Sequence, residues 1–131
     1  MILIDTSAWI DFFRGRDPMS RAVDDVLATN EAAICGPIET ELRRGFATDR
    51  ERKRVLPLLE ALHSLAEPEG LWRDAGDLGF ALRRRGVSPK TLDLLIATYA
   101  LSHSAILLSA DKDFREIRSA GVPIQLAPLV R

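Results

Sequence analysis

Short apolar runs alternate with longer helical patterns along the chain, and this alternation restricts the fold more than any other feature. The runs 2–4, 32–35 and 106–109 have the length and composition of strands that are buried on both faces. Amphipathic stretches of helical periodicity separate them. Strands that alternate with helices form parallel sheets with helices on both faces. The sequence therefore predicts an α/β fold with three layers (α/β/α) and a central, mainly parallel sheet.

The remaining elements follow from periodicity and from helix start and stop signals. We expect helices over residues 6–13, 20–28, 37–45, 50–63, 71–85, 89–103 and 112–119, and short strands over 65–66 and 123–126. Pro37 and Pro89 favour the first turn of a helix, where their missing N–H groups leave no hydrogen bond unmade. The chain of 131 residues has the length of one domain and no internal repeat. We expect residues 1–131 to form a single domain.

Composition excludes several classes of protein. Apolar residues make up 47% of the chain and charged residues 28%, which excludes disordered and collagen-like chains. The formal net charge of -1 neither favours nor excludes nucleic acid as a partner. Cys35 is the single cysteine, and the two histidines stand far apart, so the sequence has neither an internal disulfide nor the spacing of a zinc site. No apolar run approaches the ~18–20 residues of a membrane span, so we expect a cytoplasmic protein without a membrane partner.

Four acidic residues are expected to converge on one edge of the sheet. Asp5 follows the first strand, and Asp111 lies two residues beyond the strand that ends at Ser109. Glu41 and Asp93 each occupy the fifth position of a helix that begins with proline, about 6 Å from its start. Both helices connect to parallel strands and so begin at the carboxyl edge, where ligands of such sheets bind. The sequence therefore places all four carboxylates on a single rim.

Such a cluster requires protons or a cation. Two like charges about 4 Å apart repel by about 4 kcal/mol at an effective dielectric near 20. Asp93 lies on a helix that is apolar almost all round, where an uncompensated carboxylate costs several kcal/mol. Oxygen ligands without histidine or cysteine suit Mg²⁺ or Mn²⁺. These ions support hydrolysis of phosphodiesters, which is the reaction that we expect.

The same residues lie in four motifs that resemble those of PIN-domain ribonucleases. The motifs are Asp5-Thr6-Ser7-Ala8-Trp9, Glu41-Leu42-Arg43-Arg44-Gly45, Asp93-Leu94-Leu95-Ile96-Ala97-Thr98-Tyr99-Ala100 and Ser109-Ala110-Asp111-Lys112-Asp113-Phe114. They occur in the family's order and cover the whole chain. This compact form most resembles the VapC toxins of bacterial toxin–antitoxin pairs.

The resemblance implies a PIN-like fold and a Mg²⁺-dependent endoribonuclease that cleaves structured RNA, commonly tRNA or rRNA. It also implies homodimerisation and inhibition by a small VapB-type antitoxin. Asp113 is either a further metal ligand or a residue that contacts only its own backbone, and Thr6 and Ser109 are candidate supporting residues. The catalytic residues and metal ligands would be Asp5, Glu41, Asp93 and Asp111.

Two basic stretches and two aromatic residues are candidate contact sites. Arginine outnumbers lysine 15 to 3, and arginine-rich stretches near the rim would favour the phosphates of RNA, although they are also typical of solvated helix faces. Helical spacing favours core or dimer packing for Trp9 and Phe13, and as exposed apolar positions they would form a dimer interface or an antitoxin groove. The candidate RNA-binding residues are Arg43, Arg44, Arg83, Arg84, Arg85 and Lys90.

Alternatives remain open from the sequence alone. A catalytically inactive PIN-fold module that binds RNA or a protein would keep the fold and lack metal binding. A phosphatase of the haloacid-dehalogenase type would use Asp5 as nucleophile, but that family has a second Asp where Ser7 stands here. Individually, Asp5 and Asp111 are also plausible helix caps, and Glu41 has the spacing to pair with Arg44. Glu39 lies on another side of its helix and is expected to face solvent.

Overall fold

The computed structural model describes residues 1–129, in which five strands form one parallel sheet. The strand order is β3-β2-β1-β4-β5, and every neighbouring pair is parallel. All five carboxyl ends therefore lie at the same edge of the sheet, with β1 in the centre. The strands are β1 (Ile2–Ile4), β2 (Ala32–Ile34), β3 (His63–Ser64), β4 (Ile106–Leu108) and β5 (Gln125–Leu126).

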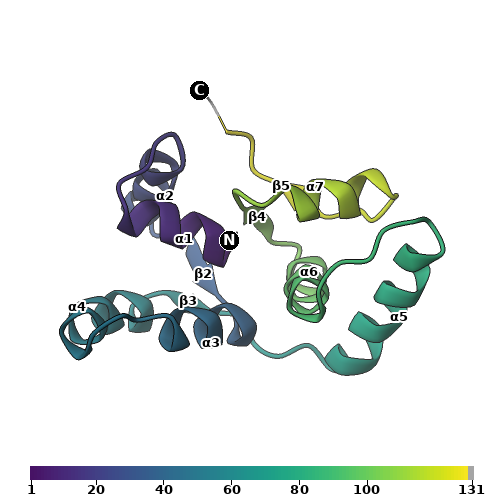
Figure 1. The fold of residues 1–131 in the computed structure, drawn as a ribbon, viewed down its shortest axis with the longest axis horizontal. Coiled ribbons are helices and arrows are strands. Elements are labelled where there is room, and N and C mark those ends of the chain that lie inside the picture. Colours follow the sequence, from purple (N-terminus) through teal and green to yellow (C-terminus); the bar gives the residue numbers. More distant parts are fainter. Residues whose placement is uncertain (130–131) are drawn as a thin grey trace.

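Seven helices connect these strands within the described residues. The connections move from β1 through β2 to β3 in one direction, and then from β3 to β4 and β5 in the other. Because parallel crossovers are right-handed, α1–α4 cover one face and α5–α7 the opposite face, and Figure 1 shows these two groups to the left and right of the strands. The α/β/α layering with a parallel sheet is confirmed. The helices are α1 (Thr6–Phe13), α2 (Met19–Ala28), α3 (Gly36–Arg44), α4 (Asp49–Glu60), α5 (Leu71–Arg83), α6 (Thr91–His103) and α7 (Lys112–Ser119).

The start of α6 differs from the expectation in a way that matters for the site. The helix begins at Thr91 rather than at Pro89, because Lys90 is still extended (φ -65°, ψ 155°). Asp93 is therefore the third helical residue instead of the fifth, and lies closer to the sheet edge than expected. Earlier in the chain, the strand expected at 65–66 lies at His63–Ser64 instead, because α4 ends at Glu60 rather than at residue 63.

The core lies between the central strands and the helices on both sides. Leu3 and Leu107 are fully buried in the sheet, and residues 95–100 of α6 are all buried. That helix packs against both α5 and α3, which explains why its sequence is apolar all round. None of the helices in the described part of the chain is long and apolar enough to cross a membrane.

The expectation that Trp9 is exposed is wrong. Trp9 is fully buried in the core, because α2 packs back against α1. Its ring stacks on Phe13 and meets Phe12 edge-on, with centroids 5.8 Å apart in both pairs. Phe13 is half-buried and Ile10 is 38% exposed. Helical periodicity placed these apolar residues on one side of α1 but did not indicate which of them α2 covers.

Candidate active site

Asp5 stands at the carboxyl end of the central strand, where two serines fix its side chain. Its backbone N–H donates to the carbonyl of Leu108 at 2.9 Å, which joins the ends of β1 and β4. Its Oδ2 accepts hydrogen bonds from Ser7 Oγ at 2.7 Å and from Ser109 Oγ at 2.9 Å. Asp5 occupies the N-cap position of α1 but its side chain makes no capping hydrogen bond. The capping interpretation of this carboxylate is therefore wrong.

The same two hydroxyl groups hold the loop that follows β4. Ser7 Oγ accepts a hydrogen bond from the N–H of Ala110, and Ser109 Oγ accepts one from the N–H of Asp111, both at 3.0 Å. Each hydroxyl thus donates to Asp5 and accepts from the loop. This arrangement fixes Asp111 relative to Asp5 although the two residues are far apart in the sequence.

Asp93, Asp111 and Asp113 form the tightest acidic cluster of the described residues. Each offers a carboxylate oxygen, and these three oxygens lie within 4.8 Å of one another. Asp93 comes from the first turn of α6, and the other two come from the start of α7. Asp111 also caps α7, because its Oδ1 accepts a hydrogen bond from the N–H of Asp113 at 2.9 Å. The Asp111 side chain therefore both caps α7 and belongs to the acidic cluster.

Burial raises the pKa values of Asp93 and Asp5, and like charges raise that of Asp93 further. The pKa of Asp93 is raised to about 7, first by burial and then by the carboxylates of Asp111, Asp5 and Asp113, while Lys90 lowers it. Burial also raises the pKa of Asp5, against the lowering effect of the serine hydroxyls. Burial, reinforced by repulsion between neighbouring carboxylates, therefore raises the pKa of Asp93 towards neutral pH.

One oxygen of this cluster has no partner. Asp93 Oδ2 is buried and accepts no hydrogen bond from the described residues, a costly state for a polar atom. Three converging carboxylates, one of them with an unpartnered buried oxygen, are the donor set that a hard divalent cation such as Mg²⁺ or Mn²⁺ prefers. The residues present fit such an ion.

Glu41 lies at the same edge but is held separately. Its Oε1 accepts a hydrogen bond from Thr6 Oγ1 at 2.8 Å, which ties α3 to the start of α1. The pairing with Arg44 that its spacing allowed is not among the ion pairs of the described residues. The carboxylates of Asp5 and Glu41 are not members of the 4.8 Å cluster. Hydroxyl donors next to each of them hold these two carboxylates in place.

The basic residues that sequence analysis singled out have mixed surroundings. Arg43 Nε and Glu39 Oε1 form an ion pair at 3.0 Å. Glu39 is partly exposed, as expected. Arg84 lies over the ring of Phe80 at 5.7 Å, and Arg85 Nη1 donates to the carbonyl of Ala120. Arg44, Arg83 and Lys90 are exposed, and Lys90 is close enough to Asp93 to lower its pKa.

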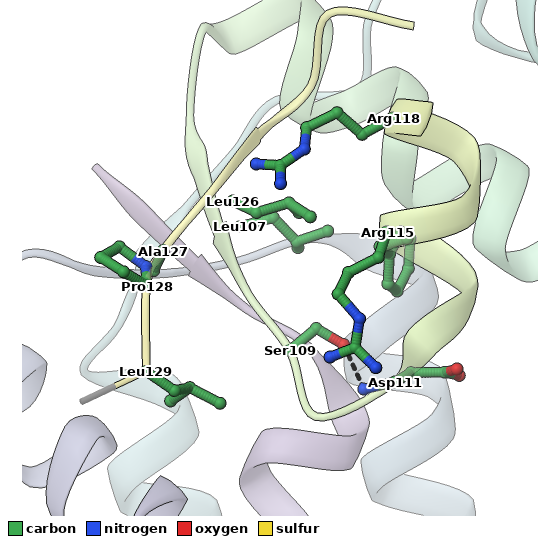
Figure 2. Close-up of a pocket in the computed structure, with 10 residues that line it drawn as sticks. Leu107, Ser109, Asp111, Arg115, Arg118, Leu126, Ala127, Pro128 and Leu129 are labelled. Atoms are coloured by element: carbon green, nitrogen blue, oxygen red, sulfur yellow. Dashed lines mark hydrogen bonds between the residues drawn. The ribbon is translucent and has the colours of Figure 1, made fainter. Parts of the chain in front are cut away.

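Sequence analysis missed two arginines beside the cluster. Arg115 and Arg118 line a cavity of about 350 Å³ that Ser109 and Asp111 also line, as Figure 2 shows. The signal was present in their positions four and seven residues after Asp111, because this spacing places side chains on one face of a helix.

Residues 2–120 match the family model described as the PIN domain. The chain belongs to the PIN-domain family. It is 34% identical over 119 residues to VapC ribonuclease Mb1587 of Mycobacterium bovis, a match that covers 87% of this chain and 89% of that protein. Ribonuclease VapC11 of Mycobacterium tuberculosis matches with the same identity and coverage.

Solved structures of VapBC complexes share this fold. VapBC-1 from nontypeable Haemophilus influenzae superposes with a TM-score of 0.78 at 21% identity, over 100% of both chains. VapBC2 from Rickettsia felis, solved with a DNA fragment from its promoter, gives a TM-score of 0.76 at 20% identity, over 97% of this chain and 98% of that chain. The resemblance to the PIN fold that the four motifs indicated is confirmed.

The metal-free protein should lose stability as pH rises, because of Asp93. Its pKa in the folded protein, about 7, lies above its ordinary value of 3.8. At pH values between these two, the folded state therefore holds a proton that the unfolded state has lost. The free energy of unfolding should therefore fall as pH rises from 4 to 8. Asp93→Asn should flatten this profile and stabilise the metal-free protein at pH 8 by about 1–3 kcal/mol.

Urea unfolding in the presence of a chelator, repeated across this pH range, measures the effect. Asp24→Asn, at an exposed position on α2, is the matched control and should leave the wild-type profile unchanged. An Asp93→Asn profile with the wild-type slope would contradict the assignment of the pH dependence to this carboxylate.

Proposed function

We propose that this PIN-domain protein is a metal-dependent endoribonuclease and the toxin component of a VapBC-type toxin–antitoxin pair. Its substrate would be structured RNA, with tRNA or rRNA as the expected class, and its place of action the cytoplasm. The observation that carries the proposal is the unpartnered, buried Asp93 Oδ2 at the centre of an all-oxygen cluster. Relatives named VapC ribonucleases, at 34% identity, support it.

The acidic residues have separate roles in this proposal. Asp93, Asp111 and Asp113 would hold Mg²⁺ or Mn²⁺, with Asp5 and Glu41 as neighbouring acidic groups. When bound, such an ion supplies Lewis-acid stabilisation of charge on a phosphodiester. Ser7 and Ser109 keep the Asp5 carboxylate beside the cluster. Thr6 holds Glu41 at the same edge, so these carboxylates would be fixed in place before a substrate binds.

The phosphatase alternative receives no support from the site. A nucleophilic carboxylate has to reach its substrate, whereas Asp5 is only 4% exposed and its Oδ2 accepts two hydroxyl hydrogen bonds. An inactive PIN-fold module would bind RNA without cleaving it.

A groove beside Glu41, lined by both apolar and charged side chains, is the proposed binding site of the VapB-type antitoxin. Ile10 and Phe13 of α1, together with Leu42 and Phe46, line a cavity of about 230 Å³ that reaches Glu41. An apolar antitoxin segment bound there would cover the acidic edge and block access to it. Phe13 lines this groove, whereas Trp9, whose buried ring stacks on Phe13, does not.

Helix α5 offers the surface that we propose for a homodimer. Trp72 and Phe80 are 68% and 66% exposed, one turn to either side of Gly76. A Cβ atom at Gly76 would meet no atom within 4 Å. Glycine in an exposed helix interior costs about 1 kcal/mol relative to alanine, and nothing within the chain requires it here. Close approach of another helix would explain it.

A second copy fits this surface better than an unrelated partner because the surface is self-complementary. Two copies of α5 that cross antiparallel at Gly76 would place Trp72 of one copy against Phe80 of the other, twice. The same crossing brings Glu69, just before the helix, towards Arg83 at its end, so opposite charges meet on both sides of the crossing. The aromatic pairs would supply most of the apolar contact area.

Replacing the central carboxylate should abolish both metal binding and cleavage. Asp93→Asn removes one ligand charge, so kcat/KM for RNA cleavage with Mg²⁺ or Mn²⁺ should fall at least about 100-fold. Divalent ions should raise the Tm of the wild type and leave that of Asp93→Asn unchanged, because only a bound ion stabilises the folded state. Asp24→Asn should behave as wild type in both assays.

Cleavage of transcripts, followed by mapping of the new ends, measures the activity. Undiminished cleavage by Asp93→Asn would refute the metal-ligand assignment. RNA binding without cleavage and without a metal-dependent rise in Tm, in the wild type itself, would favour the inactive module.

Disruption of the α5 surface should produce monomers. Trp72→Asp introduces a charge opposite Phe80 of the second copy, so sedimentation equilibrium should give the mass of one chain, against twice that mass for the wild type. Ile10→Asp, an equivalent change in the proposed antitoxin groove, should leave the dimer intact and weaken antitoxin binding. A wild type that sediments as one chain, or a dimer unaffected by Trp72→Asp, would contradict this interface.

A further inference from the structure

Helix α7 directs two arginines towards a hollow next to the acidic cluster. The cavity of about 350 Å³ has Ser109 and Asp111 at one end and Arg115 and Arg118 along the α7 side (Figure 2). Its remaining walls are apolar, and they come from β4, from α7, from β5 and from the segment after β5. These apolar residues are Leu107, Phe114, Leu126, Ala127, Pro128 and Leu129.

Neither arginine is neutralised by a carboxylate among residues 1–129. Arg115 follows Asp111 by four residues, a spacing at which helical ion pairs form, yet the described ion pairs do not include it. The Asp111 carboxylate instead caps the helix, and in Figure 2 it points away from the Arg115 guanidinium. Arg118 is not part of any ion pair of the described residues either. Two cationic groups that face a hollow without a partner favour an anion there.

We propose that this cavity is a subsite for the backbone phosphate next to the scissile one, and that Arg115 and Arg118 bind that phosphate. The proposal rests on the proposed ribonuclease function. The planar guanidinium group matches two oxygens of a phosphate in a bidentate hydrogen bond. The apolar walls accommodate the sugar and base of the same nucleotide. The subsite lies beside the cluster, so binding here positions the strand across the acidic edge.

The chemistry of this contact determines what it does for the reaction. A phosphate contact fixes the position of a strand without reading its sequence. It is made equally in the ground state and in the transition state, so its loss should raise KM and leave kcat nearly unchanged. Arg115 and Arg118 are thus substrate-binding residues, whereas the carboxylates are the proposed metal ligands.

The first test compares two double variants that remove the same charge. Arg115→Ala/Arg118→Ala should raise KM at least about tenfold for an RNA oligonucleotide that the wild type cleaves at one mapped bond, with kcat within about threefold. Arg21→Ala/Arg52→Ala, on α2 and α4, is the matched control and should keep the wild-type KM. Arg115→Lys/Arg118→Lys should recover part of the loss, because lysine keeps the charge but not the planar fork.

A second measurement identifies the phosphate. Methylphosphonate replaces one phosphate at a time by a neutral group. In the wild type, one replacement next to the cleaved bond should raise KM about as much as the double alanine substitution does. In Arg115→Ala/Arg118→Ala the same replacement should have little further effect, since the contact is already lost.

Binding of the same RNA without divalent ions separates this proposal from the proposed function. The double variant should raise Kd and reduce the slope of log Kd against log salt concentration by about 0.7 for one lost phosphate contact. Equal KM and Kd in the two double variants would overturn the subsite and leave the ribonuclease intact. Binding that depends on Arg115 and Arg118, in a wild type that cleaves no RNA, would overturn the ribonuclease and leave the subsite.

Discussion

The carboxyl edge of the sheet carries more negative charge than the chain neutralises. Asp93 is buried in the first turn of an apolar helix, next to two other carboxylates, and one of its oxygens has no partner among the described residues. The packing of α6 against α5 and α3 holds Asp93 at this edge in spite of that cost. A site that is unfavourable in the absence of a ligand and well ordered by its surroundings is typical of functional positions.

Hydroxyl groups are what make the edge rigid. Ser7 and Ser109 connect Asp5 to the loop after β4, and Thr6 connects Glu41 to the start of α1. Each hydroxyl donates to a carboxylate, so it partly compensates a negative charge without adding a positive one. The charge therefore stays available for a cation. A lysine or arginine in these positions would have neutralised the carboxylates and filled the space that an ion needs.

Much of this arrangement could be predicted from the sequence, because it follows from topology. Parallel strands share a carboxyl edge, so the placement of Asp5 and Asp111 required only the order of strands and helices. The closer grouping of Asp93 with Asp113 could not be predicted, since it depends on where α6 begins and on hydrogen bonds of about 3 Å. The burial of Trp9 was missed for a related reason: periodicity gives the apolar side of α1, whereas the packing of α2 decides what is covered. The role of Arg115 and Arg118 could not be predicted, because an arginine four residues after a carboxylate is also the spacing of an ordinary helical ion pair.

Anomalous diffraction from crystals grown with Mn²⁺ tests the central claim most directly. The account predicts a manganese peak at the carboxyl edge, within about 2.0–2.3 Å of carboxylate oxygens of Asp93 and Asp111, and no such peak in crystals of Asp93→Asn. Wild-type crystals in which manganese is bound only elsewhere, or which show no peak at this edge, would contradict the account.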